Sequence, residues 1–123
     1  GLAEGFEITD EIYLKTDGFE NNVLPLLRAD YLFDASRFTP PPMAPASEQE
    51  NWQHPPGSNL VVWANALQAS PVVVSELGDG PSAFNNPGFQ HLLENALRWT
   101  ASTAAREWAR SCDTGQPGIL QPV

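Results

Sequence analysis

The densest hydrophobic segments of the chain lie side by side at residues 60–67 and 71–77, with the sequences LVVWANAL and PVVVSEL. At the centre of each segment, β-branched and apolar residues occupy both alternating faces, which is typical of strands that are covered on two sides. The gap between them, Gln68-Ala69-Ser70, has a length that suits a hairpin. We therefore predict two interior strands joined by a tight turn.

From Pro87 onward the hydrophobic period becomes helical. The positions that share one helical face are Phe89, Leu92, Leu93, Ala96, Leu97 and Thr100. Asn86 can cap the first free amides, and Pro87 at the first helical position loses no needed donor. This pattern predicts one long C-terminal helix, and a second helical piece at 103–111 follows a bend near Ala101-Ser102.

The first third of the chain has weaker β-like patterns. Residues 6–8 and 11–15 read FEI and EIYLK, and a further strand is expected from Leu26 or Leu27 to Phe33, because Pro25 is unfavourable in a central strand. Together these segments predict an α/β protein with about four strands in a mostly mixed sheet and the long helix against one face.

The 123 residues fit a single domain, 1–123. A proline-rich loop covers residues 39–58, where little helix is expected and where Trp52 and Met43 are candidate apolar anchors. An irregular tail is expected at 112–123. The chain has one cysteine, Cys112, so it cannot form an internal disulfide.

The net charge of −9 excludes some partners. No run of Lys or Arg is present to contact phosphates, so we expect neither nucleic acid nor an anionic membrane surface as a partner. The sequence contains no signal peptide and no apolar stretch long enough to span a membrane. It does not assign a compartment.

Asp79 is the first candidate for chemistry. It follows the strand 71–77 in the sequence Leu77-Gly78-Asp79-Gly80, just before the long helix. Open α/β sheets bind ligands at the carboxyl ends of their strands, and glycines such as Gly78 and Gly80 let backbone amides approach a ligand closely. The alternative is that both glycines only shape a turn and that Asp79 is a solvated loop acid.

Asp10-Glu11 is the second candidate. Adjacent residues on a strand point to opposite faces, so only one of the two acids can face a site. We expect this to be Glu11, with the phenol of Tyr13 on the same side. The alternative is an edge-strand acid in water.

Two residues of the proline-rich loop complete the set. His54 lies between Gln53 and Pro55, where a rigid backbone could hold it as a base or a ligand, or it is a surface residue. Trp52 is a candidate platform for a sugar ring. Glu11, His54 and Asp79 could bind a divalent ion only if the fold assembled them, so the sequence assigns neither a metal nor a cofactor.

Several segments resemble ThuA-like domains, the trehalose-utilisation family, whose fold is flavodoxin-like or class I glutamine-amidotransferase-like. FEITDEIYLK is similar to the family's F-x-I-x-D-E-x-Y segment. Leu77-Gly78-Asp79-Gly80, followed by Phe84, Asn86-Pro87 and Arg98-Trp99, resembles a strand that ends in Leu-Gly-His-Gly before Phe, Asn-Pro and a helix that closes with Arg-Trp. The resemblance covers roughly residues 1–102 and only the C-terminal half of the family domain.

The resemblance implies a protein of carbohydrate metabolism that acts on or binds a sugar or sugar derivative. Together with the arguments from the residues above, the candidate catalytic residues are Asp79, Glu11 and His54, and the candidate ligand-binding residues are Tyr13, Trp52, Gly78 and Gly80. The family's frequent histidine is Asp79 here, and an aspartate is a weak base near pH 7 unless its pKa is raised. The alternative function is therefore a non-catalytic partial domain that associates with a partner chain, either a second copy or the missing N-terminal half.

Overall fold

Three antiparallel strands form the sheet of this α/β protein. The computed structural model describes residues 4–13, 15, 17–31, 40, 42–52 and 57–112. Within them the sheet has the order β1-β2-β3, where β1 is Leu24–Arg28, β2 is Leu60–Leu67 and β3 is Ser70–Ser75. The helices are the 3₁₀-helix η1 (Asp17–Asn22), α1 (Ala46–Glu50), α2 (Pro81–Phe84), α3 (Pro87–Thr100) and α4 (Thr103–Cys112).

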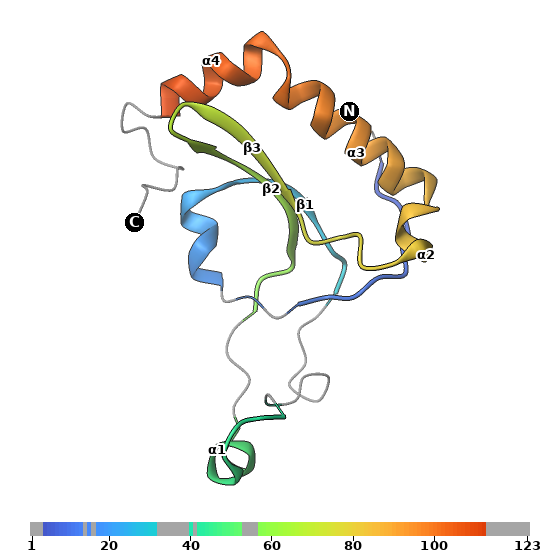
Figure 1. The fold of residues 1–123 in the computed structure, drawn as a ribbon, viewed down its shortest axis with the longest axis vertical. Coiled ribbons are helices and arrows are strands. Elements are labelled where there is room, and N and C mark those ends of the chain that lie inside the picture. The colour runs from blue at the N-terminus through green and yellow to red at the C-terminus, as the bar shows by residue number, and fades with distance from the viewer. Residues whose placement is uncertain are drawn as a thin grey trace.

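The central strand β2 is covered on both faces, as its apolar pattern predicts. On one face Trp63 packs against Phe19 of η1, with 5.0 Å between ring centroids. On the other face Ala66 packs with Ala109 and Cys112 of α4. Figure 1 shows the sheet between these two layers, with η1 on one side and α3 and α4 on the other.

The turn between β2 and β3 is shorter than the sequence suggests. Leu67 pairs with Ser70, so only Gln68 and Ala69 remain in the turn. Their φ angles are 48° and 61°. Positive φ at both positions is typical of the two-residue hairpin turn whose twist matches that of the flanking strands. Neither residue is glycine or asparagine, so the turn is held by the pairing of the two strands and not by favourable turn residues.

The expectation of about four strands in a mixed sheet is not met in the described residues. Residues 6–8, 11–13 and 15, which belong to the expected FEI and EIYLK strands, form no strand. β1 begins at Leu24 and includes Pro25, which is tolerated because β1 is an edge strand. β1 ends at Arg28 and residues 29–31 form no strand, so the expected continuation toward Phe33 is wrong up to Tyr31, and its last two residues lie outside the described part of the chain.

The loop at 39–58 also differs from expectation. It contains the helical turn α1, which lies at the opposite end of the molecule from α4 (Figure 1). Met43 is 95% exposed and Trp52 is 37% exposed, so neither anchors the loop in the core.

The helical region agrees well with its pattern. Asn86 Oδ1 accepts hydrogen bonds from the amides of Gly88 (2.9 Å) and Phe89 (3.1 Å), which caps α3. Ser102 Oγ accepts one from the amide of Ala105 (3.0 Å) at the start of α4. Helix α4 continues to Cys112, which is buried, so the irregular tail does not begin at that residue.

One position on the apolar face of α3 does not fit the expectation. Phe89 is buried, whereas Leu97 is 71% exposed. α3 lies next to β3, which is a half-buried edge strand and not the interior strand that its apolar run predicts. No further described strand lies beyond β3 to cover this leucine.

An ion pair with an additional hydrogen bond from Ser58 joins η1 to the sheet. Arg28 donates from both terminal nitrogens to the Glu20 carboxylate, and Ser58 Oγ donates to Glu20 Oε1. Ser58 is buried and also accepts from the amide of Leu60. The hydrogen bonds from Arg28 and then Ser58 hold the pKa of Glu20 below its ordinary value of 4.5.

This network makes stability depend on pH. A carboxyl group whose pKa is lowered in the folded state stabilises the protein above its unfolded pKa, and this contribution is lost as the pH falls through the folded pKa. We expect Glu20→Gln to lower the free energy of unfolding by about 0.5–1 kcal/mol at pH 7, and the difference from wild type to shrink below about pH 4.5. Urea denaturation between pH 3 and pH 7 measures this. Glu107→Gln removes the same charge from an exposed position of α4 and should show no such trend.

Candidate functional site

The N-terminal segment and the loop after β3 are joined by one carboxylate. Asp10 Oδ2 accepts a hydrogen bond from the amide of Gly78 at 2.7 Å, and Asp10 Oδ1 accepts one from the amide of Asp79 at 3.1 Å. Two neighbouring backbone amides that point at one anion form a small anion-binding site, and here the protein fills it with its own side chain. The position of Asp79 is therefore set by Asp10.

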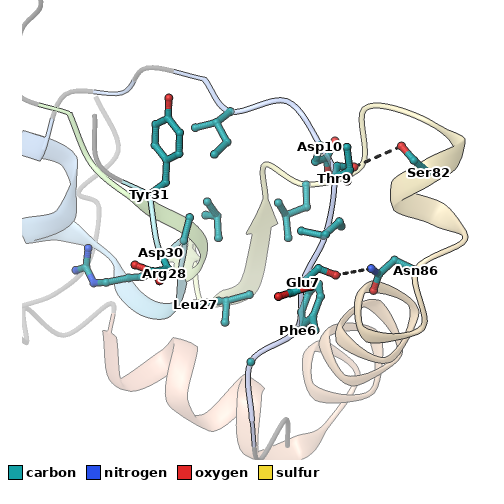
Figure 2. Close-up of a pocket in the computed structure, with 16 residues that line it drawn as sticks. Phe6, Glu7, Thr9, Asp10, Leu27, Arg28, Asp30, Tyr31, Ser82 and Asn86 are labelled. Carbon is teal, nitrogen blue, oxygen red and sulfur yellow. Dashed lines mark hydrogen bonds between the residues drawn. The ribbon is translucent and has the colours of Figure 1, made fainter. Parts of the chain in front are cut away.

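Further contacts hold the same segment against α2 and α3. Ser82 Oγ donates to the carbonyl of Thr9 (3.4 Å), and Asn86 Nδ2 donates to the carbonyl of Glu7 (2.6 Å), as Figure 2 shows. The ring of Phe6 lies so close to Gly88 that a Cβ on this glycine would come within 2.4 Å of it. The segment is thus fixed by side-chain contacts and not by a strand ladder.

A second link ties the segment to the end of β3. Lys15 forms an ion pair with Glu76, and the two side chains are only 15% and 12% exposed. The carbonyl of Lys15 also accepts from the amide of Ser58 (2.8 Å). These contacts place Lys15 beside the residues that follow β3.

Acidic groups and a phenol gather where these segments meet. The hydroxyl of Tyr13 donates to Glu11 Oε2 at 2.7 Å. This hydrogen bond, followed by the charge of Glu11 and the weaker charges of Asp79 and Asp10, raises the pKa of Tyr13 above its ordinary value of 10.0. The phenol is therefore a hydrogen-bond donor at neutral pH, and three carboxylates raise its pKa.

A groove begins beside this cluster. Its volume is about 900 Å³. The residues that line it are Gly5, Phe6, Glu7, Ile8, Thr9, Asp10, Ile12, Leu27, Arg28, Ala29, Asp30, Tyr31, Val61, Leu77, Ser82 and Asn86. Figure 2 shows the N-terminal segment along one wall and the end of β1, with Arg28, Asp30 and Tyr31, along the other.

The structure brings some of the candidate residues together. Glu11, Tyr13, Gly78 and Asp79 meet, although all four flank the groove and do not line it. Gly80 precedes α2 with φ −151°, an extended conformation open to any residue, so its backbone does not require glycine.

The proline-rich loop contributes no described residue to the lining of the groove. Trp52 follows α1, and no residue of 46–52 lines the groove. His54 lies outside the described residues. In the part of the chain that is described, no group of three or more His, Cys, Asp or Glu residues could hold a metal ion.

Asp10 is the residue that reasoning from the sequence missed. Treating residues 10 and 11 as a strand forced a choice between two faces and favoured Glu11. In an extended segment without a strand ladder, Asp10 instead turns to the amides of Gly78 and Asp79. A local signal was present, because an aspartate beside a glycine-containing loop is a ready acceptor for free amides. Its partner, 68 residues away, was not predictable.

Comparison of the chain with protein-family models, with curated proteins and with solved structures finds no match. None of the described helices has the length and apolar character needed to cross a membrane.

The two glycines around Asp79 should respond differently to substitution. Gly78 has a φ of +120°, and a Cβ there would meet Phe89 at 3.2 Å and Phe84 at 3.4 Å. We expect Gly78→Ala to lower the free energy of unfolding by about 1–3 kcal/mol, because the backbone conformation is strained for alanine. Gly80→Ala meets no atom within 4 Å and should change stability by less than about 0.5 kcal/mol. Equal losses in urea denaturation would contradict this assignment.

Titration of Tyr13 tests the acidic cluster. In a Tyr31→Phe background Tyr13 is the only tyrosine, so its ionisation can be followed by ultraviolet absorbance. We expect a midpoint above 10.0, and Glu11→Ala should lower it, because the hydrogen bond and the nearest negative charge are both removed. Glu107→Ala, a distant exposed acid, should leave it unchanged. A midpoint that does not move in Glu11→Ala would show that the two groups do not interact in solution.

Proposed function

We propose that this protein binds a sugar or sugar derivative in the groove beside Asp79 and works in carbohydrate metabolism as a ThuA-like, partly flavodoxin-like protein. The observation that carries the proposal is the contact of Asp10 with the amides of Gly78 and Asp79. This contact joins the two segments that resemble the family, F-x-I-x-D-E-x-Y and Leu-Gly-x-Gly, at one edge of the groove.

The chemistry of the groove supports a hydroxyl-rich ligand. Its volume lies within the range of small-molecule sites, which is roughly 300–1,000 Å³. Sugars present apolar C–H faces and hydroxyl groups that both donate and accept. Phe6, Ile8 and Leu77 offer apolar surface, and Glu7 and Asp30 bring carboxylates that can accept from hydroxyls.

Each residue of the cluster has a distinct role in this proposal. Asp79 accepts a hydrogen bond from a hydroxyl of the ligand, and Glu11 holds the single phenol proton of Tyr13, so the phenol oxygen can accept from the ligand. Asp10 is a positioning residue, since its carboxylate is already occupied by two amides. Gly78 supplies one of these amides and the backbone turn.

Binding without turnover is the second candidate. No histidine lines the groove in the described part of the chain, and the residue that takes the place of the family's histidine is the exposed Asp79. A site with exposed carboxylates and a protonated phenol can bind hydroxyl groups, although it has no described group suited to take a proton at pH 7.

One titration tests both candidates. We expect trehalose or glucose, added up to about 10 mM, to shift the amide signals of Gly78, Asp79 and Tyr13 in ¹⁵N-resolved spectra of the full chain. Asp79→Asn should weaken binding at least about tenfold, equivalent to about 1.4 kcal/mol, because a charged acceptor is lost. Glu107→Gln serves as the matched control.

The outcomes separate clearly. Shifts of the protein amide signals without any change in the sugar spectrum over time support binding alone. New sugar signals that form with the wild-type protein and not with Asp79→Asn support catalysis. Shifts that Asp79→Asn leaves unchanged, or no shifts with either sugar, would refute the proposal.

A further inference from the structure

The two edges of the sheet differ in regularity. β1 carries Pro25 and two irregularities in its pairing with β2. β3 pairs with β2 over six consecutive residue pairs without interruption, from Leu67–Ser70 to Val62–Ser75. Bulges and prolines protect an edge from further pairing, and a regular, uncharged strand lacks such protection. The sequence of β3, SPVVVS, has no charged residue.

The register shows which backbone groups β3 leaves free. The amide of Glu76 donates to the carbonyl of Val61 at 3.0 Å, so Glu76 faces β2. Because hydrogen-bonding direction alternates along a strand, Ser70, Val72 and Val74 also face β2. Pro71, Val73 and Ser75 therefore direct their backbone groups away from the sheet, and the described residues provide them with no backbone partner.

An apolar hollow lies beside this free edge. It has a volume of about 170 Å³ and is lined by Val62, Val73, Ser75, Leu92, Leu93, Ala96, Leu97 and Thr100. None of these residues is charged, and Leu97 is 71% exposed. An unpaired strand edge and an exposed leucine thus occur on the same side of the molecule.

We propose that a second copy of this chain pairs with β3 through a two-fold axis at Val73, which makes a continuous six-stranded antiparallel sheet. The free groups are self-complementary in this arrangement. The two Val73 residues exchange two hydrogen bonds, and each Ser75 amide donates to the carbonyl of Pro71 in the other copy. Pro71 fits because only its carbonyl is needed. The axis also brings the two hollows together, so that each Leu97 gains apolar cover.

The charge of the chain favours this surface for self-association. Two chains with a net charge of −9 repel each other, and contact through charged surface would add to this repulsion. The free edge of β3 and the hollow bury no charge when two copies meet. Because salt screens the remaining repulsion, the dimer should become tighter as ionic strength rises.

Sedimentation of the full chain tests the dimer. We expect a species of twice the 13.4 kDa chain mass at roughly 10–100 µM, with a dissociation constant that falls between low and high salt. Leu97→Lys should weaken the dimer at least tenfold, although it makes the net charge less negative. Val73→Pro should also weaken the dimer, because it removes the Val73 amide that each copy donates to the other. The amides that β3 donates to β2 are unaffected, since Val73 faces away from β2.

The control is Leu26→Lys, which places the same charge at a 49% exposed leucine on the opposite edge strand. It should keep the wild-type mass. Circular dichroism confirms that each variant is folded. The proposal would be overturned if the wild-type protein were a monomer at about 100 µM. It would also be overturned if folded Leu97→Lys and Val73→Pro still formed dimers, or if only Leu26→Lys lost the dimer. This inference does not depend on sugar binding, and a failure of either leaves the other intact.

Discussion

The contact between the Asp10 carboxylate and the amides of Gly78 and Asp79 is the interaction on which the site depends. It connects a segment without regular secondary structure to the loop that leaves β3. Hydrogen bonds between a carboxylate and backbone amides are stronger than neutral ones, so a single side chain can fix both partners. Together with the Lys15–Glu76 ion pair, it places Glu11 and Tyr13 near Asp79.

The remaining anchors of the N-terminal segment work in the same way. Asn86 caps α3 with its oxygen and holds Glu7 with its nitrogen, so one side chain serves both the helix and the groove. Gly88 gives Phe6 the room to pack on α3. The wall of the groove is therefore built from the start of α3, and a change that disturbs this helix end would also change the shape of the groove.

The proposed site and the proposed dimer interface use different parts of β3. The site uses the loop that follows its last residue, and the interface uses the outer backbone of Pro71, Val73 and Ser75. Both features arise because β3 is at once the edge of the sheet and the strand that leads into the loop.

The sequence by itself determined the local elements. The apolar runs fix β2 and β3, and the helical period with Asn86 and Pro87 fixes the start of α3, because these patterns depend on neighbouring residues alone. Only the tertiary structure decided that residues 4–13 form no strand, that Leu97 is exposed and that Asp10 holds the loop. Burial and hydrogen bonds between distant residues depend on which surfaces meet, and hydrophobic spacing along the chain carries no information about that.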